Sequence, residues 1–213
     1  MKRKLVLIAL LVLPLLLYIY FSMAKHNSLY LPVITKNVSE LPVAEGSAPA
    51  QLSGKITILG FLGNDAVKRK ESIFNLNQKI NNKFSGFNDF QIVMVLPEGD
   101  EQQVDAIRAS LKNMGDINKW KFVYTDPKTI QKIYASLKVK EPLGTDLGTD
   151  RVFIIDKKRC LRGRKGNFKG DSEFRDSYST FSAAEVHNQL TDDVKIVLRE
   201  YRLALKRNTK REI

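Results

Sequence analysis

From Lys55 onward the sequence alternates short apolar runs with amphipathic segments, and this order constrains the fold more than any other feature. Residues 56–62 and 90–96 are continuous apolar runs, the pattern of strands buried on both faces. Residues 68–84 and 101–114 carry apolar side chains at helical spacing, which predicts two helices. Strands connected through helices lie parallel, with the helices packed on the sheet.

The alternation continues through a third strand and helix. Residues 120–124 alternate in polarity, and Asp126 followed by proline predicts a helix start with an acidic cap. The loop over residues 138–150 contains the tripeptide Gly-Thr-Asp twice, without the spacing of a phosphate-binding loop. Residues 152–155 are a further buried strand, and a hairpin brings the chain back at Cys160.

A C-terminal helix is predicted to run to about residue 206. Ser182 and Glu185 have the spacing of a capping box at its start. This order of elements, closing with a hairpin and a helix, is that of the thioredoxin fold. We predict an α/β, thioredoxin-like three-layer sandwich over residues 54–206, with a central mostly parallel sheet, a C-terminal β-hairpin and helices on both faces. Residues 207–213 form a basic tail.

The N-terminal segment predicts one transmembrane helix. Three basic residues precede Leu5, and the run from Leu5 to Phe21 contains no charge. The excess of basic residues before the run places the N-terminus in the cytoplasm and the domain on the periplasmic side of the inner membrane. Residues 1–24 are thus an anchor, and residues 25–53, rich in Pro, Ser and Ala, a stalk. The alternative is a signal peptide cleaved after residues 22–24.

Charge and cysteine content exclude several functions. The chain of 213 residues has 35 Lys and Arg against 23 Asp and Glu, a net charge of +12, with the excess at its two ends. One cysteine and two histidines exclude an intrachain disulfide, a Cys-x-x-Cys pair and a local histidine cluster for a metal. Because the domain is exported, we expect no nucleic-acid partner; residues 5–21 would contact the lipid bilayer.

The chain resembles the Sco/SenC branch of thioredoxin-like proteins over roughly residues 25–206. An anchor and a proline-containing stalk lead to residues 55–61 (KITILGF), where that family has its first core strand. Residues 120–127 (WKFVYTDP) and 152–156 (VFIID) resemble its later strands. The resemblance implies a membrane-tethered copper chaperone or thiol reductase for cytochrome oxidase assembly.

The residues that would carry this chemistry are missing. The family has a Cys-x-x-x-Cys pair after its first core strand, whereas residues 62–70 read LGNDAVKRK. The family's copper-binding histidine precedes the later core strand, but this chain has none between His26 and His187. Copper(I) prefers thiolates, and exchange within one chain needs a second cysteine. We expect a degenerate member without cofactor or enzymatic activity: a protein-binding module in envelope or respiratory assembly.

Two groups of residues remain as a possible interaction surface. They are Asn64, Asp65, Lys68 and Arg69 after the first core strand, and Arg159, Arg162 and Arg164 in the hairpin. One alternative function is thiol redox chemistry through Cys160, whose pKa the neighbouring arginines would lower. Otherwise Cys160 is a half-buried strand residue without chemistry. A further alternative is a basic peripheral module that binds anionic lipid, for which the basic stretch over residues 157–169 is a candidate.

Overall fold

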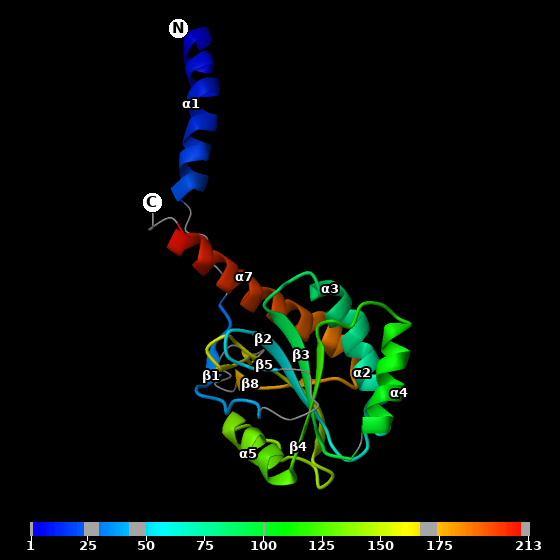
Figure 1. Ribbon diagram of the computed structural model, residues 1–213. Coiled ribbons are helices and arrows are strands. Elements are labelled where there is room, and N and C mark those ends of the chain that lie inside the picture. Colours follow the sequence, from blue (N-terminus) through cyan, green and yellow to red (C-terminus); the bar gives the residue numbers. More distant parts are fainter. Residues whose placement is uncertain (1, 24–29, 43–49, 100, 167–173, 210–213) are drawn as a thin grey trace.

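The computed structural model describes residues 2–23, 30–42, 50–99, 101–166 and 174–209 (Figure 1). Its helices are α1 (Lys2–Met23), α2 (Lys70–Leu76), α3 (Asn82–Phe84), α4 (Glu101–Lys112), α5 (Pro127–Leu137), α6 (Ala183–Glu185) and α7 (Thr191–Thr209). Its strands are β1 (Val33–Thr35), β2 (Ile56–Leu62), β3 (Phe90–Pro97), β4 (Trp120–Thr125), β5 (Gly148–Ile155), β6 (Leu161–Arg162), β7 (Arg164–Lys165), β8 (Phe174–Arg175) and β9 (Tyr178–Ser179).

The main sheet has the strand order β1-β6-β5-β2-β3-β4, and β9 adds to β5. β2, β3 and β4 are parallel as predicted, but β5 is antiparallel to β2, so the sheet is mixed rather than mostly parallel. The cause is the loop after α5, which carries the chain to the end of the sheet where β2 finishes. Gly148 therefore pairs with Leu62, and β5 runs back from there to pair Ile155 with Thr57.

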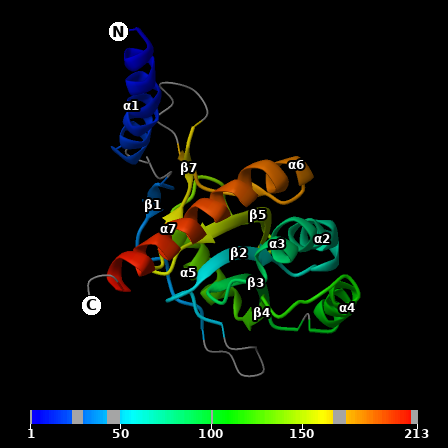
Figure 2. The same cartoon turned by 90° about the horizontal axis from the view of Figure 1, so that it is seen from above.

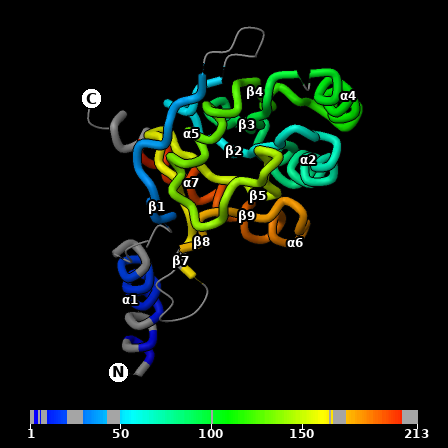
Figure 3. The backbone as a smooth tube through the Cα atoms, turned by 90° about the horizontal axis from the view of Figure 1, so that it is seen from below, coloured from blue at the N-terminus to red at the C-terminus, as the bar shows by residue number. Residues whose placement is uncertain are grey.

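Helices cover both faces of this sheet, as predicted. α2 to α4 and α7 bury apolar side chains against one face, and Figure 2 shows α7 lying across it. The other face is covered by α5 and by residues 38–42 and 50–52, and Figure 3 shows α5 on that side. Successive strand residues divide between the two cores, Ile58 facing one and Leu59 the other, because strand side chains alternate.

The two predicted helix starts are present. Asp126 accepts hydrogen bonds from the backbone N–H groups of Lys128 and Thr129 and begins α5. Ser182 accepts from the Glu185 N–H and begins α6. The Glu185 carboxylate does not close a capping box, because it accepts from the backbone of Ser179 instead.

Residues 30–42 and 50–53 differ from the predicted stalk, because they belong to the domain. β1 pairs with β6 at the sheet edge. Leu31, Val38, Leu41 and Leu52 are buried among the core residues. Isolated apolar residues between prolines give no period, so this packing left no pattern for sequence analysis to detect.

α1 is a single helix that points away from the domain (Figure 1). Among the residues whose side chains the structure describes, no helix combines the length and the apolar character needed to cross a membrane. The span predicted over residues 5–21 includes positions 5, 7–9 and 21, whose side chains lie outside that described set.

Arg162 joins three separate segments of the domain. Its guanidinium, 2% exposed, is 2.8 Å from the carboxylate of Asp156 in the hairpin turn and is also paired with Glu200 on α7. Its Nε donates to the Leu31 carbonyl at 2.8 Å, and the Tyr30 ring lies 4.8 Å above it. A buried guanidinium whose three nitrogens each donate a hydrogen bond is the arrangement in which a charge is tolerated in a core.

Replacing Arg162 by methionine should lower the free energy of unfolding by about 3–5 kcal/mol, because the buried Asp156 carboxylate would lose its partner. The measurement is urea unfolding. Lys195→Met, which breaks the exposed pair with Asp192, is the matched control and should cost less than about 1 kcal/mol. Equal losses in the two variants would contradict a special role for Arg162.

Candidate functional site

The loop that follows β2 is the position at which Sco/SenC proteins carry their paired cysteines, and here it is closed against the loop before β5. The Asn64 N–H donates to the Asp146 carbonyl at 2.9 Å. Gly63 has φ +71°, and a Cβ there would lie 2.5 Å from that same carbonyl oxygen. Only glycine combines this left-handed backbone with so close an approach.

Arg69 fills the space between the two loops. It lies in the short 3-10 turn Val67–Arg69, which directs its side chain inward. Its Nη1 donates to the Leu62 carbonyl and to the Asp146 carboxylate, both at 2.7 Å. Its Nε is 3.2 Å from the Asp150 carboxylate. Gly148 leaves room for the guanidinium, since a Cβ there would lie 2.5 Å from its central carbon.

The aspartates of the repeated Gly-Thr-Asp tripeptide are therefore partners of Arg69, a role that sequence analysis missed. Burial opposes the ionisation of Asp146, but hydrogen bonds from Arg69 and from the Gly148 N–H outweigh it and hold the pKa of Asp146 below its ordinary value. The repeated tripeptide is the sequence feature from which this role could have been inferred, because two carboxylates at equivalent positions of one loop suit a single guanidinium.

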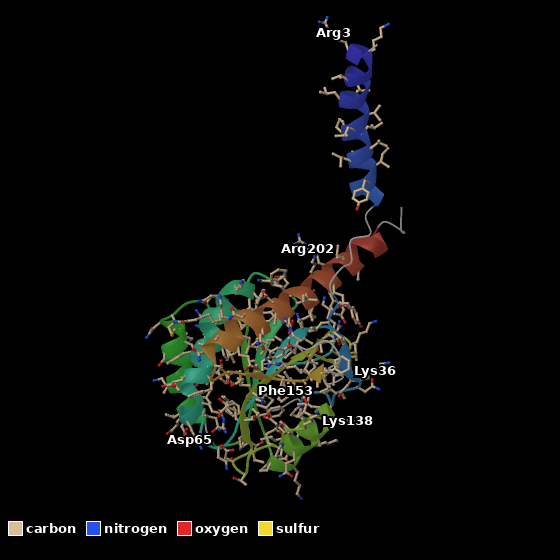
Figure 4. The ribbon with its side chains drawn as sticks, turned by 180° about the vertical axis from the view of Figure 1, so that it is seen from behind. Arg3, Lys36, Asp65, Lys138, Phe153 and Arg202 are labelled. Atoms are coloured by element: carbon tan, nitrogen blue, oxygen red, sulfur yellow. The ribbon has the colours of Figure 1, made fainter. Side chains whose placement is uncertain are left out.

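The other predicted residues of this loop are exposed. Asn64, Asp65 and Lys68 present their side chains to solvent, and the Asp65 carboxylate accepts from the Lys68 N–H at 3.1 Å. In Figure 4 Asp65 lies at the end of the domain away from α1. Arg69 is 7% exposed, so it supports this surface from beneath and does not belong to it.

The hairpin arginines lie at the opposite end of the sheet. The pairing of Thr57 with Ile155 places the turn that follows β5 beside the start of β2. Arg162 is buried, and Arg164 binds the buried Asp193 carboxylate at 2.7 Å. Arg159, at positive φ, is half-buried. The predicted interaction residues therefore form two separate groups.

Cys160 lies with this second group. It is 9% exposed, and its N–H donates to Asp156 at 2.9 Å. Burial, followed by the neighbouring Asp156 carboxylate, raises the pKa of the Cys160 thiol, whereas the nearby arginines suggested a lowered pKa. The direction is reversed because burial and the Asp156 carboxylate outweigh the lowering effect of Arg162 on the pKa of the thiol. A buried thiol with a raised pKa is a poor nucleophile.

Comparison with known proteins bears on the fold. No protein-family profile and no curated protein matches the sequence. BsSco, a member of the Sco family of cytochrome c oxidase assembly proteins in which a disulfide switch was identified, superposes with a TM-score of 0.53 at 14% identity, over 78% of this chain and 95% of that one. The chain has a Sco-like thioredoxin fold. A putative electron transport protein from Aquifex aeolicus VF5 gives a TM-score of 0.50 at 13% identity, over 79% and 98%.

A copper ion does not fit the Sco-like site of this chain. The groups that meet there are one guanidinium and the carboxylates of Asp146 and Asp150, which offer copper(I) no soft donor and already neutralise one another. Cys160 belongs to the opposite end of the β2–β5 pair. We therefore derive no step through copper.

Replacing Arg69 by methionine should lower the free energy of unfolding by about 2–3 kcal/mol at pH 7, since Asp146 and the Leu62 carbonyl lose a charged donor and Asp150 loses its ion-pair partner. The pKa of Asp146 is depressed in the folded chain, so its contribution is present above the unfolded-state pKa and is lost as pH falls through the folded value.

Urea unfolding at pH 7 and at pH 3 checks both statements. The difference between the parent chain and Arg69→Met should shrink in acid. Lys68→Met, at an exposed neighbouring position, should change stability by less than about 0.5 kcal/mol. A pH-independent difference would show that Arg69 acts through packing alone.

Cys160 should react slowly and should not hold copper. We expect iodoacetamide to alkylate it at least about tenfold more slowly in the folded chain than in urea, because the thiol is buried and its pKa is raised. A copper(I) titration of the same sample should leave all copper with a competing chelator. Rapid alkylation would support single-cysteine chemistry, and one copper per two chains would indicate a dimer that shares two Cys160 thiolates.

Proposed function

We propose that this chain is a membrane-tethered, extracytoplasmic protein-binding module that uses a Sco-like thioredoxin fold without redox or copper chemistry. Its partner would be a protein of envelope or respiratory assembly. Support for respiratory assembly comes from the fold that it shares with BsSco, a member of a family of cytochrome c oxidase assembly proteins. A shared fold supports a role only by analogy, so the local site carries more of the argument.

The observation that carries the proposal is the closure of the loop after β2 by Arg69, Asp146 and Asp150. Ion pairs occupy the position at which redox or copper chemistry would need two thiols. The loop is thereby fixed, while Asp65 and Lys68 stay exposed around Val67, whose side chain is 54% exposed. A rigid loop that presents one apolar side chain between opposite charges suits protein recognition, because little entropy is lost on binding.

The proposed tether is α1. The run from Leu5 to Phe21 is uncharged and is flanked by basic residues on its N-terminal side, which favours a cytoplasmic N-terminus. Leu10, Leu11 and Leu13 are each more than half exposed, so α1 does not bury these side chains in the domain. A helix with apolar side chains on all of its sides needs an apolar environment to cover them.

Site-directed photo-crosslinking of the full chain in its own membranes tests the partner surface. A photoreactive phenylalanine at Val67 should give a discrete protein adduct, whereas the same group at exposed Lys128 on α5 should not. Asp65→Lys and Lys68→Glu should each reduce the Val67 adduct several-fold, because they reverse charges beside it. An adduct that ignores both reversals, or none from Val67, would overturn the proposal.

A further inference from the structure

The outer face of α7 carries a row of basic side chains. Lys195, Arg199 and Arg202 are exposed and follow one another at helical spacing, and Lys195 is paired with Asp192 at 2.7 Å. The opposite side of the helix is buried in the core through Val194 and Val197, so the basic row faces outward. Arg199 and Arg202 have no acidic side chain three or four positions away on the exposed face, and Glu200 is committed to Arg162. A row of this kind is attracted to an anionic surface.

A groove runs beside this row. It has a volume of about 570 Å³ and lies between α7 and the segment from Tyr30 to Pro32. Its lining combines the apolar side chains of Leu31 and Ile196 with Arg199 and two ion pairs. In these pairs Asp192 binds Lys195 and Asp193 binds Arg164, each at 2.7 Å. Tyr30 is 58% exposed, and tyrosine at such a position favours the boundary between lipid and water. Because both aspartates are already paired, Arg199 can bind the headgroup of an anionic phospholipid while Leu31 and Ile196 contact its upper chain.

The connection to α1 fixes where this surface can be. Six residues, and hence seven steps from one Cα to the next, separate Met23, the last residue of α1, from Tyr30. An extended chain of that length spans at most roughly 25 Å. The segment after Tyr30 is held to the domain, because Arg162 donates to the Leu31 carbonyl and the Gly163 N–H donates to the Pro32 carbonyl at 3.1 Å. The tether therefore keeps the groove and the basic row close to the bilayer.

The two ends of the domain therefore differ in their position relative to α1. In Figure 4 Arg202 lies at the end that faces α1, and Asp65 lies at the far end. We propose that the outer face of α7, with the Tyr30 groove, binds anionic phospholipid headgroups and so orients the loop after β2 away from the membrane. This inference rests on the proposed tether and adds to it a second, charge-dependent contact.

The test places a spin label on α7 of the full chain in lipid nanodiscs. Leu203→Cys puts the label at an exposed, uncharged position of α7, and native Cys160 is buried. In nanodiscs with 30% phosphatidylglycerol, collision of the label with a water-soluble nickel complex should fall at least threefold relative to pure phosphatidylcholine, because nearby basic residues are drawn to anionic lipid. A label at Val67→Cys should show no change.

Charge and salt provide the matched controls. Arg199→Glu with Arg202→Glu, or 0.5 M NaCl, should abolish the protection of the Leu203 label, since both remove the attraction to headgroups. Lys128→Glu with Lys132→Glu reverses the same number of exposed charges on α5 and should leave it intact. Equal protection in both lipids, or protection that survives salt and charge reversal, would overturn the inference.

Whether the chain stays bound to the nanodisc is measured separately from the accessibility of the spin label. A chain that stays with nanodiscs of either composition, but whose Leu203 label is equally accessible in both, retains the tether and lacks the headgroup contact. A chain that separates from both kinds of nanodisc refutes the tether itself. The lipid and salt comparisons use the unreversed chain, so they do not depend on whether a charge-reversed variant folds.

Discussion

The buried guanidinium of Arg162 is the interaction on which the arrangement of the domain depends. Through Asp156, Glu200 and the Leu31 carbonyl it binds the hairpin turn, the C-terminal helix and the segment that follows α1. A neutral side chain could pack these elements together, but it could not satisfy two carboxylates and a carbonyl at once. Arginine is therefore the residue that lets three chain segments meet at one point without an unpaired buried charge.

Arg69 connects separate chain segments in a similar way at the other end of the sheet. Arg69 donates to Asp146 and to the Leu62 carbonyl and pairs with Asp150, and so closes the loop after β2 against the loop before β5. A buried arginine and a reactive pair of cysteines have opposite requirements at this position. A pair of cysteines supplies reactivity and requires access, whereas an ion-paired guanidinium supplies rigidity and excludes access. The fold is kept because its two cores depend on the strand alternation and not on the residues of this loop.

Much of the fold could be predicted because its signals are local. Apolar runs such as 56–62 and the cap at Asp126 depend on neighbours in sequence, and they lie where they were expected. The antiparallel direction of β5 and the pairing of β1 with β6 depend on contacts between residues more than 80 positions apart. A single sequence contains no pattern that predicts such contacts. The residues of the candidate site differ in the same way, because some depend on sequence neighbours and others on distant contacts. Exposed Asp65 could be inferred from its loop, but Arg69 resembled its solvated lysine neighbours until its distant carboxylate partners were known.

The two arginine clusters also divide the domain by function. The cluster around Arg162 fixes the end from which the chain leaves for α1, and the cluster around Arg69 fixes the loop at the far end. Between them lies a sheet buried on both faces, which transmits position but has little freedom to bend. A contact at the end near α1 therefore determines the direction in which Asp65 and Lys68 point. In the function that we propose, the domain acts through this geometry, by holding the loop with Asp65 and Lys68 at a set direction and distance from a surface.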